Sequence, residues 1–346
     1  MSRFTVMVLL LAVFVGIGYG ACSWEATPTP ADDKTPPTPV TPSLPEDEDE
    51  EEEVIAGPPW PTDRALDTML LVSYGNNPRA RPQTGLEQAD VVYEVLAEGG
   101  ITRLMAVFAT YAPETIGPVR SMRQCLIEIA MGYDSPFAHA GGSMEALASI
   151  RSLQAKSLDE IYGAGSYFWR GDQRRPPDNL YTSAKELLRG AKARGFSETP
   201  LPPLSTGALD PAEAATHIVV DYSRSTTIPN RISYTYEEGR YHREVNGSPH
   251  VSTSSDQLRP HNVLFLETTT REFARGGDPF VEIDVIGQGE ALLFRSGQRY
   301  EARWAKPDVH SPFTFQLIDG EPLRFTHGQV WIHLVPSLDY VRINDE

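Results

Sequence analysis

Two arginines stand three residues apart where a Gly-Pro turn leads into a predicted helix. Arg120 and Arg123 precede an apolar pattern over residues 122–131 that is typical of a helix. The backbone N–H groups at a helix N-terminus attract anions, and each guanidinium group can hold a carboxylate or phosphate through two parallel hydrogen bonds. The spacing therefore predicts an anion site for a ligand or a partner. The alternative is internal pairing of these arginines with Glu94 and Glu98.

A histidine and a serine form a second pattern with chemical potential. His139 precedes Gly141-Gly142-Ser143, which superficially offers a nucleophile and its base. A hydrolase serine also needs a strained turn and a third orienting group, so this pattern is more typical of a turn followed by a helix N-cap. The chain contains no phosphate-binding loop, dinucleotide fingerprint or zinc motif. We therefore expect no cofactor and no metal site.

Other polar residues gather at turns of the same region. Trp169 and Arg170 follow further aromatic residues and would suit a sugar or a peptide, although such aromatics also suit a core. The candidate ligand- or partner-binding residues are Asn77, Arg79, Arg81, Glu94, Glu98, Arg103, Arg120, Arg123, His139, Ser143, Trp169, Arg170 and Asn179.

The elements that must position these residues fall into two regions, separated by Pro200-Leu201-Pro202-Pro203. Residues 62–200 combine strands with helices and are predicted to be a mixed α/β N-terminal domain, with strands over 70–74, 91–96 and 104–108 and helices over 122–131, 144–151 and 183–194. Residues 205–336 are predicted to be a mostly antiparallel β C-terminal domain, with strands over 217–221, 232–236, 241–245, 263–267, 280–286, 291–294, 298–304 and 330–335. The fold class is therefore α+β, with sheets and helices in layers.

The first residues of the chain resemble an export signal. Residues 1–22 contain Arg3, then an uncharged apolar run, then small residues that end at Cys22. This order is typical of a bacterial lipoprotein signal, although Tyr19 replaces the usual aliphatic residue. We expect lipidation of Cys22, and an uncleaved anchor would give the same topology. The protein is therefore expected on the cytoplasmic membrane, facing the extracytoplasmic side.

Residues 23–61 are rich in proline, threonine and acidic residues and lack apolar periodicity. Such a segment is predicted to be a disordered tether. The whole chain of 346 residues has a formal net charge of -17, which argues against nucleic-acid binding. Its two cysteines, Cys22 and Cys125, cannot form a disulfide framework, and the helical context of Cys125 favours a place in the core.

Several long motifs in a fixed order resemble the YerB-type family of bacterial surface lipoproteins. The motifs in the first region are residues 77–86, 89–94, 98–103 and 116–121, His139 with Gly141-Gly142-Ser143, and Phe168-Trp169-Arg170. Those in the second region are Gly247-Ser248-Pro249-His250, residues 287–295 and residues 328–332. The resemblance covers about residues 62–336 and implies a layered α+β fold, two domains and membrane attachment.

The resemblance implies no well-established reaction, because the family is known as one of unknown function. It suggests an association with cell-wall synthesis machinery. Where the family usually has Pro-His-Asn, this chain has Pro177-Asp178-Asn179. A catalytic histidine would tolerate that change poorly, whereas Asp178 can still accept hydrogen bonds.

These observations favour a binding protein over an enzyme. The leading hypothesis is a lipid-anchored adaptor that engages an envelope protein or glycan, with Arg103, Arg120 and Arg123 supplying the contacts to an anion. One alternative is an envelope hydrolase or transferase that uses Glu94 or Glu98 beside His139. Another is a lipoprotein that binds a small anionic solute.

Overall fold

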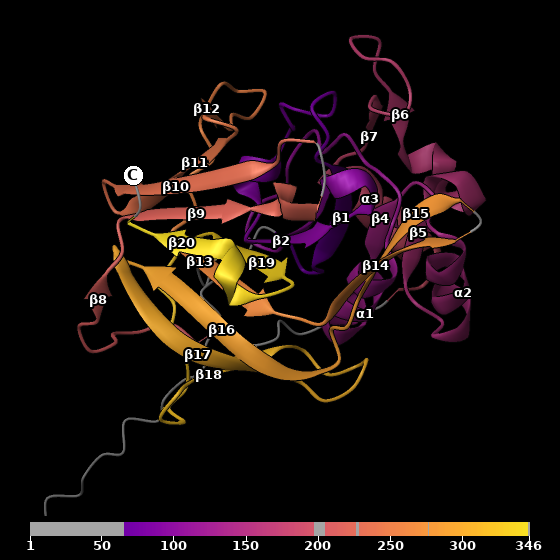
Figure 1. Ribbon diagram of the computed structural model, residues 1–346. Coiled ribbons are helices and arrows are strands. Elements are labelled where there is room, and N and C mark those ends of the chain that lie inside the picture. Colours follow the sequence, from indigo (N-terminus) through magenta and orange to yellow (C-terminus); the bar gives the residue numbers. More distant parts are fainter. Residues whose placement is uncertain (1–65, 197–204, 226–227, 276, 345–346) are drawn as a thin grey trace, which may run out of the picture. The chain divides into compact units, whose positions relative to one another are not determined.

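One large sheet runs through both of the predicted domains. The computed structural model describes residues 66–196, 205–225, 228–275 and 277–344. In the main sheet the strands follow the order β18-β17-β16-β13-β19-β2-β3-β1-β4-β5, and β8 pairs with β17 (Figure 1). The predicted signal, Cys22 and the tether lie outside the described residues.

The strands of this sheet are β1 (Leu70–Gly75), β2 (Val91–Leu96), β3 (Thr102–Phe108), β4 (Phe137–His139), β5 (Ser157–Asp159), β8 (Glu213–Ala214), β13 (Asn262–Glu267), β16 (Gly287–Arg295), β17 (Gln298–Lys306), β18 (Thr314–Leu317) and β19 (Val330–Val335). The other strands are β6 (Trp169–Arg170), β7 (Leu180–Tyr181), β9 (His217–Asp221), β10 (Arg231–Glu237), β11 (Arg240–Val245), β12 (Ser248–Pro249), β14 (Thr270–Arg275), β15 (Asp278–Ile283) and β20 (Val341–Ile343). The α-helices are α1 (Gln124–Tyr133), α2 (Met144–Ser152) and α3 (Ala184–Ala193).

Strand β19 joins the two regions of the chain. It pairs in parallel with β13 on one side and with β2 on the other, so Ile332 lies between Leu264 and Tyr93. The sequence predicted this strand but placed it at the close of the C-terminal domain. Its central position arises because all six residues of β19 are buried and apolar neighbours are available on both sides. The boundary near residue 200 stays a prediction, since the sheet crosses it.

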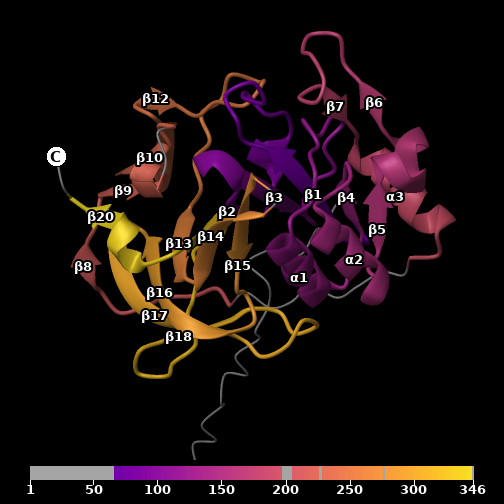
Figure 2. The same cartoon turned by 45° about the vertical axis from the view of Figure 1, so that its right-hand side comes forward.

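The helices cover both faces of the part of the sheet formed by the N-terminal region. Buried residues of α1 pack in one core with Leu71 and Met105, whereas Leu187 of α3 packs with Leu70 and Val72 in a second core on the other face. Strand alternation explains this division, because successive side chains point to opposite faces. Figure 2 shows α1 and α2 together beside the strands.

The N-cap predicted at Ser143 is confirmed, and Ser183, predicted as the first residue of its helix, is an N-cap as well. The hydroxyl of Ser143 accepts a hydrogen bond from the backbone N–H of Ala146, and the hydroxyl of Ser183 accepts one from Glu186. These contacts satisfy N–H groups that the first turn of a helix leaves without a partner. No helix within the described ranges is long and apolar enough to cross a membrane.

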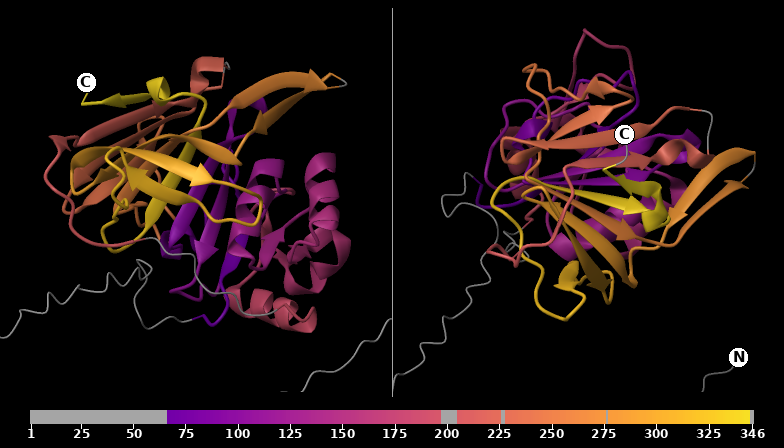
Figure 3. Two further views of the ribbon diagram at one scale, coloured as in Figure 1. Left: turned by 90° about the horizontal axis from the view of Figure 1, so that it is seen from below. Right: turned by 60° about the vertical axis from the view of Figure 1, so that its left-hand side comes forward.

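Smaller sheets complete the C-terminal region. The sheet β12-β11-β10-β9-β20 is antiparallel and packs its buried residues into the same core as β13 and β16. Strands β14 and β15 form a separate hairpin that reaches out beyond the main sheet (Figure 3). Strand β15 spans Asp278–Ile283, so the strand predicted over 280–286 is shifted toward the N-terminus. The predicted return of 298–304 on 291–294 is confirmed by the pairing of β16 with β17.

We predict that one strand controls the stability of both regions. Replacing the buried Ile332 by alanine should lower the free energy of unfolding by about 2–5 kcal/mol, because it leaves a cavity in the core that both regions share. Chemical denaturation followed by circular dichroism and by tryptophan fluorescence should show one shared transition at a lower midpoint. Two separate transitions, with only one of them shifted, would contradict a shared core.

Candidate functional site

Three arginines meet at one edge of the main sheet, where β1, β2 and β4 end. This arginine cluster consists of Arg103, Arg120 and Arg123. Arg103 is the second residue of β3 and pairs with Gly75, the last residue of β1. Its side chain shares a face with Met105, which packs with α1, so the guanidinium group faces the start of that helix. Ligands of α/β sheets commonly bind beyond the carboxyl ends of the strands.

The segment that carries Arg120 is extended rather than helical. The backbone N–H of Arg120 donates to Ser73, and that of Met122 donates to Gly141, so the segment bridges the ends of β1 and β4. The predicted helix begins later, at Gln124, and Arg123 is its N-cap residue. Arg120 and Arg123 therefore lie on the segment that leads into the helix, and the predicted helix start at residue 122 was two residues too early. Gly75 makes room for the side chain of Arg120, since a Cβ added to Gly75 would lie 2.9 Å from Arg120 Cγ.

The carboxylates beside the cluster neutralise only part of its charge. Arg123 Nε donates to Glu98 Oε2 at 2.9 Å, and Arg120 NH1 lies 3.8 Å from Asp178 Oδ1. Arg103 is 2% exposed and donates no hydrogen bond to any described residue. Burial, together with the charges of Arg123 and Arg120, lowers the pKa of Arg103 to about 9. The buried guanidinium still carries its charge at neutral pH.

Glu94 does not belong to the arginine cluster, although its place in the sequence predicted that it pairs with Arg120 or Arg123. It pairs with Leu104 in the strand register, so it lies on the face opposite to Arg103. Its Oε1 accepts hydrogen bonds from Thr102 at 2.7 Å and from Asn76 at 3.2 Å. Its Oε2 accepts hydrogen bonds from Arg243 at 2.9 Å and from Trp331 at 2.8 Å. The predicted internal pairing of the arginines therefore holds for Glu98 with Arg123, whereas Glu94 pairs with a residue of the C-terminal region.

Arg243 is the centre of a buried polar network that the sequence analysis missed. It is fully buried, stacks 4.3 Å from the ring centroid of Trp331, and donates through Nε to His250 at 2.9 Å. His250 contacts Gln83 Oε1, which extends the network into the N-terminal region. A charged residue at an inward position of the alternating strand Tyr241–Val245 is the signal that could have found it.

His139 and Ser143 are not brought together as a nucleophile and a base. Nδ1 of His139 lies 2.8 Å from the carbonyl oxygen of Gly141, and Nε2 lies 2.8 Å from the hydroxyl of Ser157. Burial lowers the pKa of His139, although Asp159 opposes that shift. No hydrogen bond or ion pair joins His139 to Glu94 or Glu98 in the part of the chain that the structure describes.

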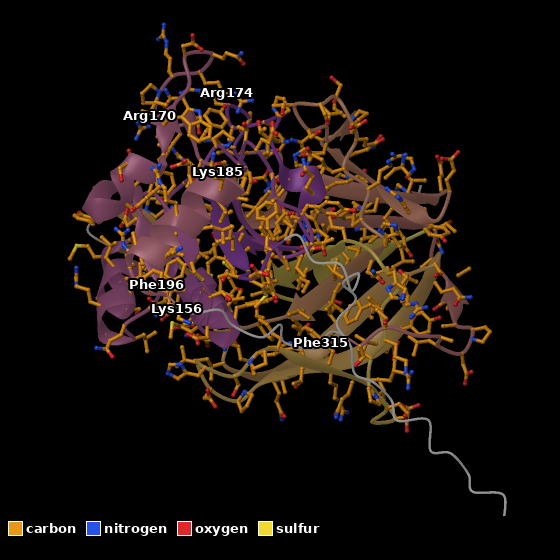
Figure 4. All side chains as sticks on the ribbon, turned by 180° about the vertical axis from the view of Figure 1, so that it is seen from behind. Lys156, Arg170, Arg174, Lys185, Phe196 and Phe315 are labelled. Carbon is orange, nitrogen blue, oxygen red and sulfur yellow. The ribbon has the colours of Figure 1, made fainter. Side chains whose placement is uncertain are left out.

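The remaining candidates belong to a hairpin beside the cluster. Arg170 donates to Asn179 and Glu160, and Arg174 donates to the backbone oxygens of Ala80 and Pro82. Figure 4 labels both arginines, which lie close to each other. Trp169 is 40% exposed. Asn77 donates to Asp178 at 3.2 Å, which confirms that Asp178 accepts a hydrogen bond in place of the histidine that the resemblance implied.

Arg79 and Arg81 lie in the loop that follows β1, and their environments differ. Arg79 is exposed, whereas Nε of Arg81 is enclosed without a partner and lies in the electrostatic field of Arg243 and Glu94. Among the described residues, no group of histidine, cysteine and acidic side chains is placed to hold a metal ion. Cys125 is buried, as predicted, and burial raises the pKa of its thiol to about 12.

Comparison with known proteins agrees with this architecture. Residues 57–197 match the N-terminal domain and residues 218–332 the C-terminal domain of a family described as a protein of unknown function, DUF3048. The chain belongs to the DUF3048 family. It is 34% identical over 283 residues to the "Putative lipoprotein YerB" of Bacillus subtilis, covering 80% of this chain and 83% of that protein.

The fold of this DUF3048 protein is also found in a solved structure. The crystal structure of YerB from Bacillus subtilis matches it with a TM-score of 0.72 and 33% sequence identity, over 80% of this chain and 94% of that one. The α+β class and the layered arrangement predicted from the sequence are therefore confirmed. The family carries no assigned reaction, so the arginine cluster must be interpreted from its own geometry.

We predict that Arg243 has a large structural role in this DUF3048 protein. Replacing Arg243 by methionine should lower the free energy of unfolding by about 3–5 kcal/mol, because it leaves Glu94 buried without its counter-charge. The matched control is Arg271→Met, which breaks exposed ion pairs and should leave the free energy of unfolding nearly unchanged. If the two substitutions lower the free energy of unfolding equally in urea denaturation, the buried pair contributes no more to stability than the exposed pairs.

Proposed function

We propose that this protein is a non-catalytic binding protein whose arginine cluster captures an anionic group of an envelope protein or glycan. The observation that carries the proposal is the state of Arg103, which is buried and donates no hydrogen bond to a described residue. A buried charge without a partner is costly in free energy. A bound carboxylate or phosphate would supply that partner through two parallel hydrogen bonds.

The local charge supports an anionic ligand. Within the part of the chain that the structure describes, the three guanidinium groups of the arginine cluster face two carboxylates, Glu98 and Asp178, so the positive charges outnumber the negative ones by one. The nearest carboxylate to Arg120 lies at 3.8 Å, which is longer than a hydrogen bond. The cluster can therefore accept one more anionic group without displacing an existing hydrogen bond from Arg103 or Arg120.

The arrangement of the other candidates favours binding over catalysis. Glu94 has its two oxygens occupied by four donors and is fully buried, so it is unsuited to exchange protons with a substrate. Burial alone would raise the pKa of Glu98, but the hydrogen bond and the charge of Arg123, with further smaller contributions, lower it below its ordinary value. A carboxylate with a lowered pKa is a weak base, which argues against the hydrolase alternative.

The place of action in this proposal is the outer face of the cytoplasmic membrane. The relative from Bacillus subtilis carries the description "Putative lipoprotein YerB", and the signal-like residues 1–22 end at Cys22. Lipidation of Cys22 would hold the protein at the membrane. The tether over 23–61 would then separate the arginine cluster from the bilayer, where it could reach the wall-synthesis machinery.

The first test separates binding from folding at Arg103. The Arg103→Met variant should bind inorganic phosphate or citrate at least about tenfold more weakly in calorimetry, since a charge-assisted contact is lost. Its free energy of unfolding should stay equal or rise, because a buried charge without a partner is removed. A large loss of stability would show that Arg103 is structural instead.

The second test asks whether a partner uses the cluster. The full chain in detergent should capture specific proteins or wall fragments from detergent-extracted membranes, and Arg120→Ala should abolish that capture while leaving the melting temperature similar. The control Arg151→Ala removes the same charge at an exposed position of α2. Capture by Arg120→Ala at the level of the control would exclude the cluster as the contact. Added salt should weaken genuine binding, because it screens charges.

A further inference from the structure

A polar cavity of about 640 Å³ lies at the opposite edge of the main sheet from the arginine cluster. Its lining includes Asp90 just before β2, Tyr111 just after β3, His261 just before β13 and Gln329 just before β19. The arginine cluster lies where β2 ends, and β2 spans six residues, so about 20 Å of strand separates the two sites. The volume falls in the range of about 300–1,000 Å³ that is usual for small-molecule sites.

The cavity is lined by charged groups that the protein itself leaves without hydrogen bonds. The side chains of Arg240, which is exposed, and of Arg259, which is half-buried, donate no hydrogen bond to a described residue, and Nδ1 of His261 is enclosed without a partner there. Glu87 Oε2 is enclosed and accepts none, and its other oxygen has one long contact of 3.5 Å from Gln88. Since enclosed polar atoms without partners cost free energy, a ligand that supplies both donors and acceptors here would be favoured.

The balance of charge limits the class of ligand. Glu87 and Asp256 offset Arg240 and Arg259, while Asp90 is held by the backbone N–H groups of residues 109 and 110. Carboxylates would repel an anion, guanidinium groups would repel a cation, and an apolar ligand would leave both unsatisfied. Hydroxyl groups donate and accept at once, so vicinal hydroxyls can bridge a guanidinium and a carboxylate.

Two further residues fit a polyhydroxylated ring. Tyr111 is 55% exposed at the cavity, which leaves its aromatic face open for the C–H face of a sugar. Burial and the charge of Arg240 lower the pKa of His261, so its imidazole is neutral at pH 7 and offers one donor and one acceptor. We infer that this cavity is a binding site for a neutral saccharide, distinct from the anion site of the proposed function.

The test uses the full chain in detergent and three neutral tetrasaccharides as probes: chitotetraose, cellotetraose and maltotetraose. Calorimetry should detect binding of at least one of them. Tyr111→Ala and Glu87→Gln should each weaken that binding about tenfold, because one loses the stacking surface and the other a charged acceptor. Because Tyr111 is exposed, the Tyr111→Ala variant should fold normally. It therefore provides a decisive test even if Glu87→Gln does not fold.

Matched controls separate this site from general effects and from the arginine cluster. Tyr162→Ala removes another exposed tyrosine, 69% exposed, and should leave saccharide affinity unchanged. Arg120→Ala should also leave it unchanged, so failure of the anion site and failure of the saccharide site give different results. Absence of binding by all three probes, or an equal loss in Tyr162→Ala, would overturn the inference. Phosphate binding that disappears in Glu87→Gln would also overturn it.

Discussion

The ion pair between Glu94 and Arg243 is the contact on which the rest of the structure depends. Each partner comes from a different region of the chain, and both side chains are fully excluded from solvent. Removing two charges from water costs several kcal/mol per ion, so the pair persists only because its surroundings complete its hydrogen bonds. Glu94 accepts hydrogen bonds from Thr102 in β3 and from Trp331 in β19. Arg243 donates one to His250, which follows β12. Correct pairing of the strands is therefore a condition for burying the charges at all.

The sheet then keeps two kinds of polar chemistry apart. On the face of Glu94, the carboxylate is paired with Arg243 and accepts a further hydrogen bond from Trp331, and such a paired network makes the interior rigid. On the face of Arg103, one step along β3, a guanidinium group is buried with no hydrogen bond to the described residues. The alternation of side chains along a strand allows this contrast between adjacent residues. A paired ionic network and a guanidinium group without a hydrogen bond to the described residues can thus lie on opposite faces of the same two strands, β2 and β3.

Local patterns predicted most of the elements, and they failed where contacts between distant residues decide the outcome. The strand over 91–96 and the caps at Ser143 and Ser183 follow from residues close in sequence, and the structure confirms them. The parallel insertion of β19 beside β2 joins residues more than two hundred positions apart, which no periodicity encodes. Glu94 and Arg243 are also far apart in sequence, so sequence patterns predicted a pairing of Glu94 with nearby arginines and gave no sign of its contact with Arg243. The arginine cluster was predicted as a set, but its extended backbone depends on the hydrogen bond from Arg120 to Ser73.

The central place of β19 has a consequence for the order in which the chain can fold. Strand β2 leaves the ribosome, and any export channel, long before the strand that pairs with it. Until residues 330–335 arrive, one edge of β2 exposes unpaired backbone groups and apolar side chains, which is the usual template for aggregation. The nascent chain therefore cannot complete its N-terminal half first and add the rest. A chain that ends before β19 would lose the core shared by both halves, however complete its first domain is.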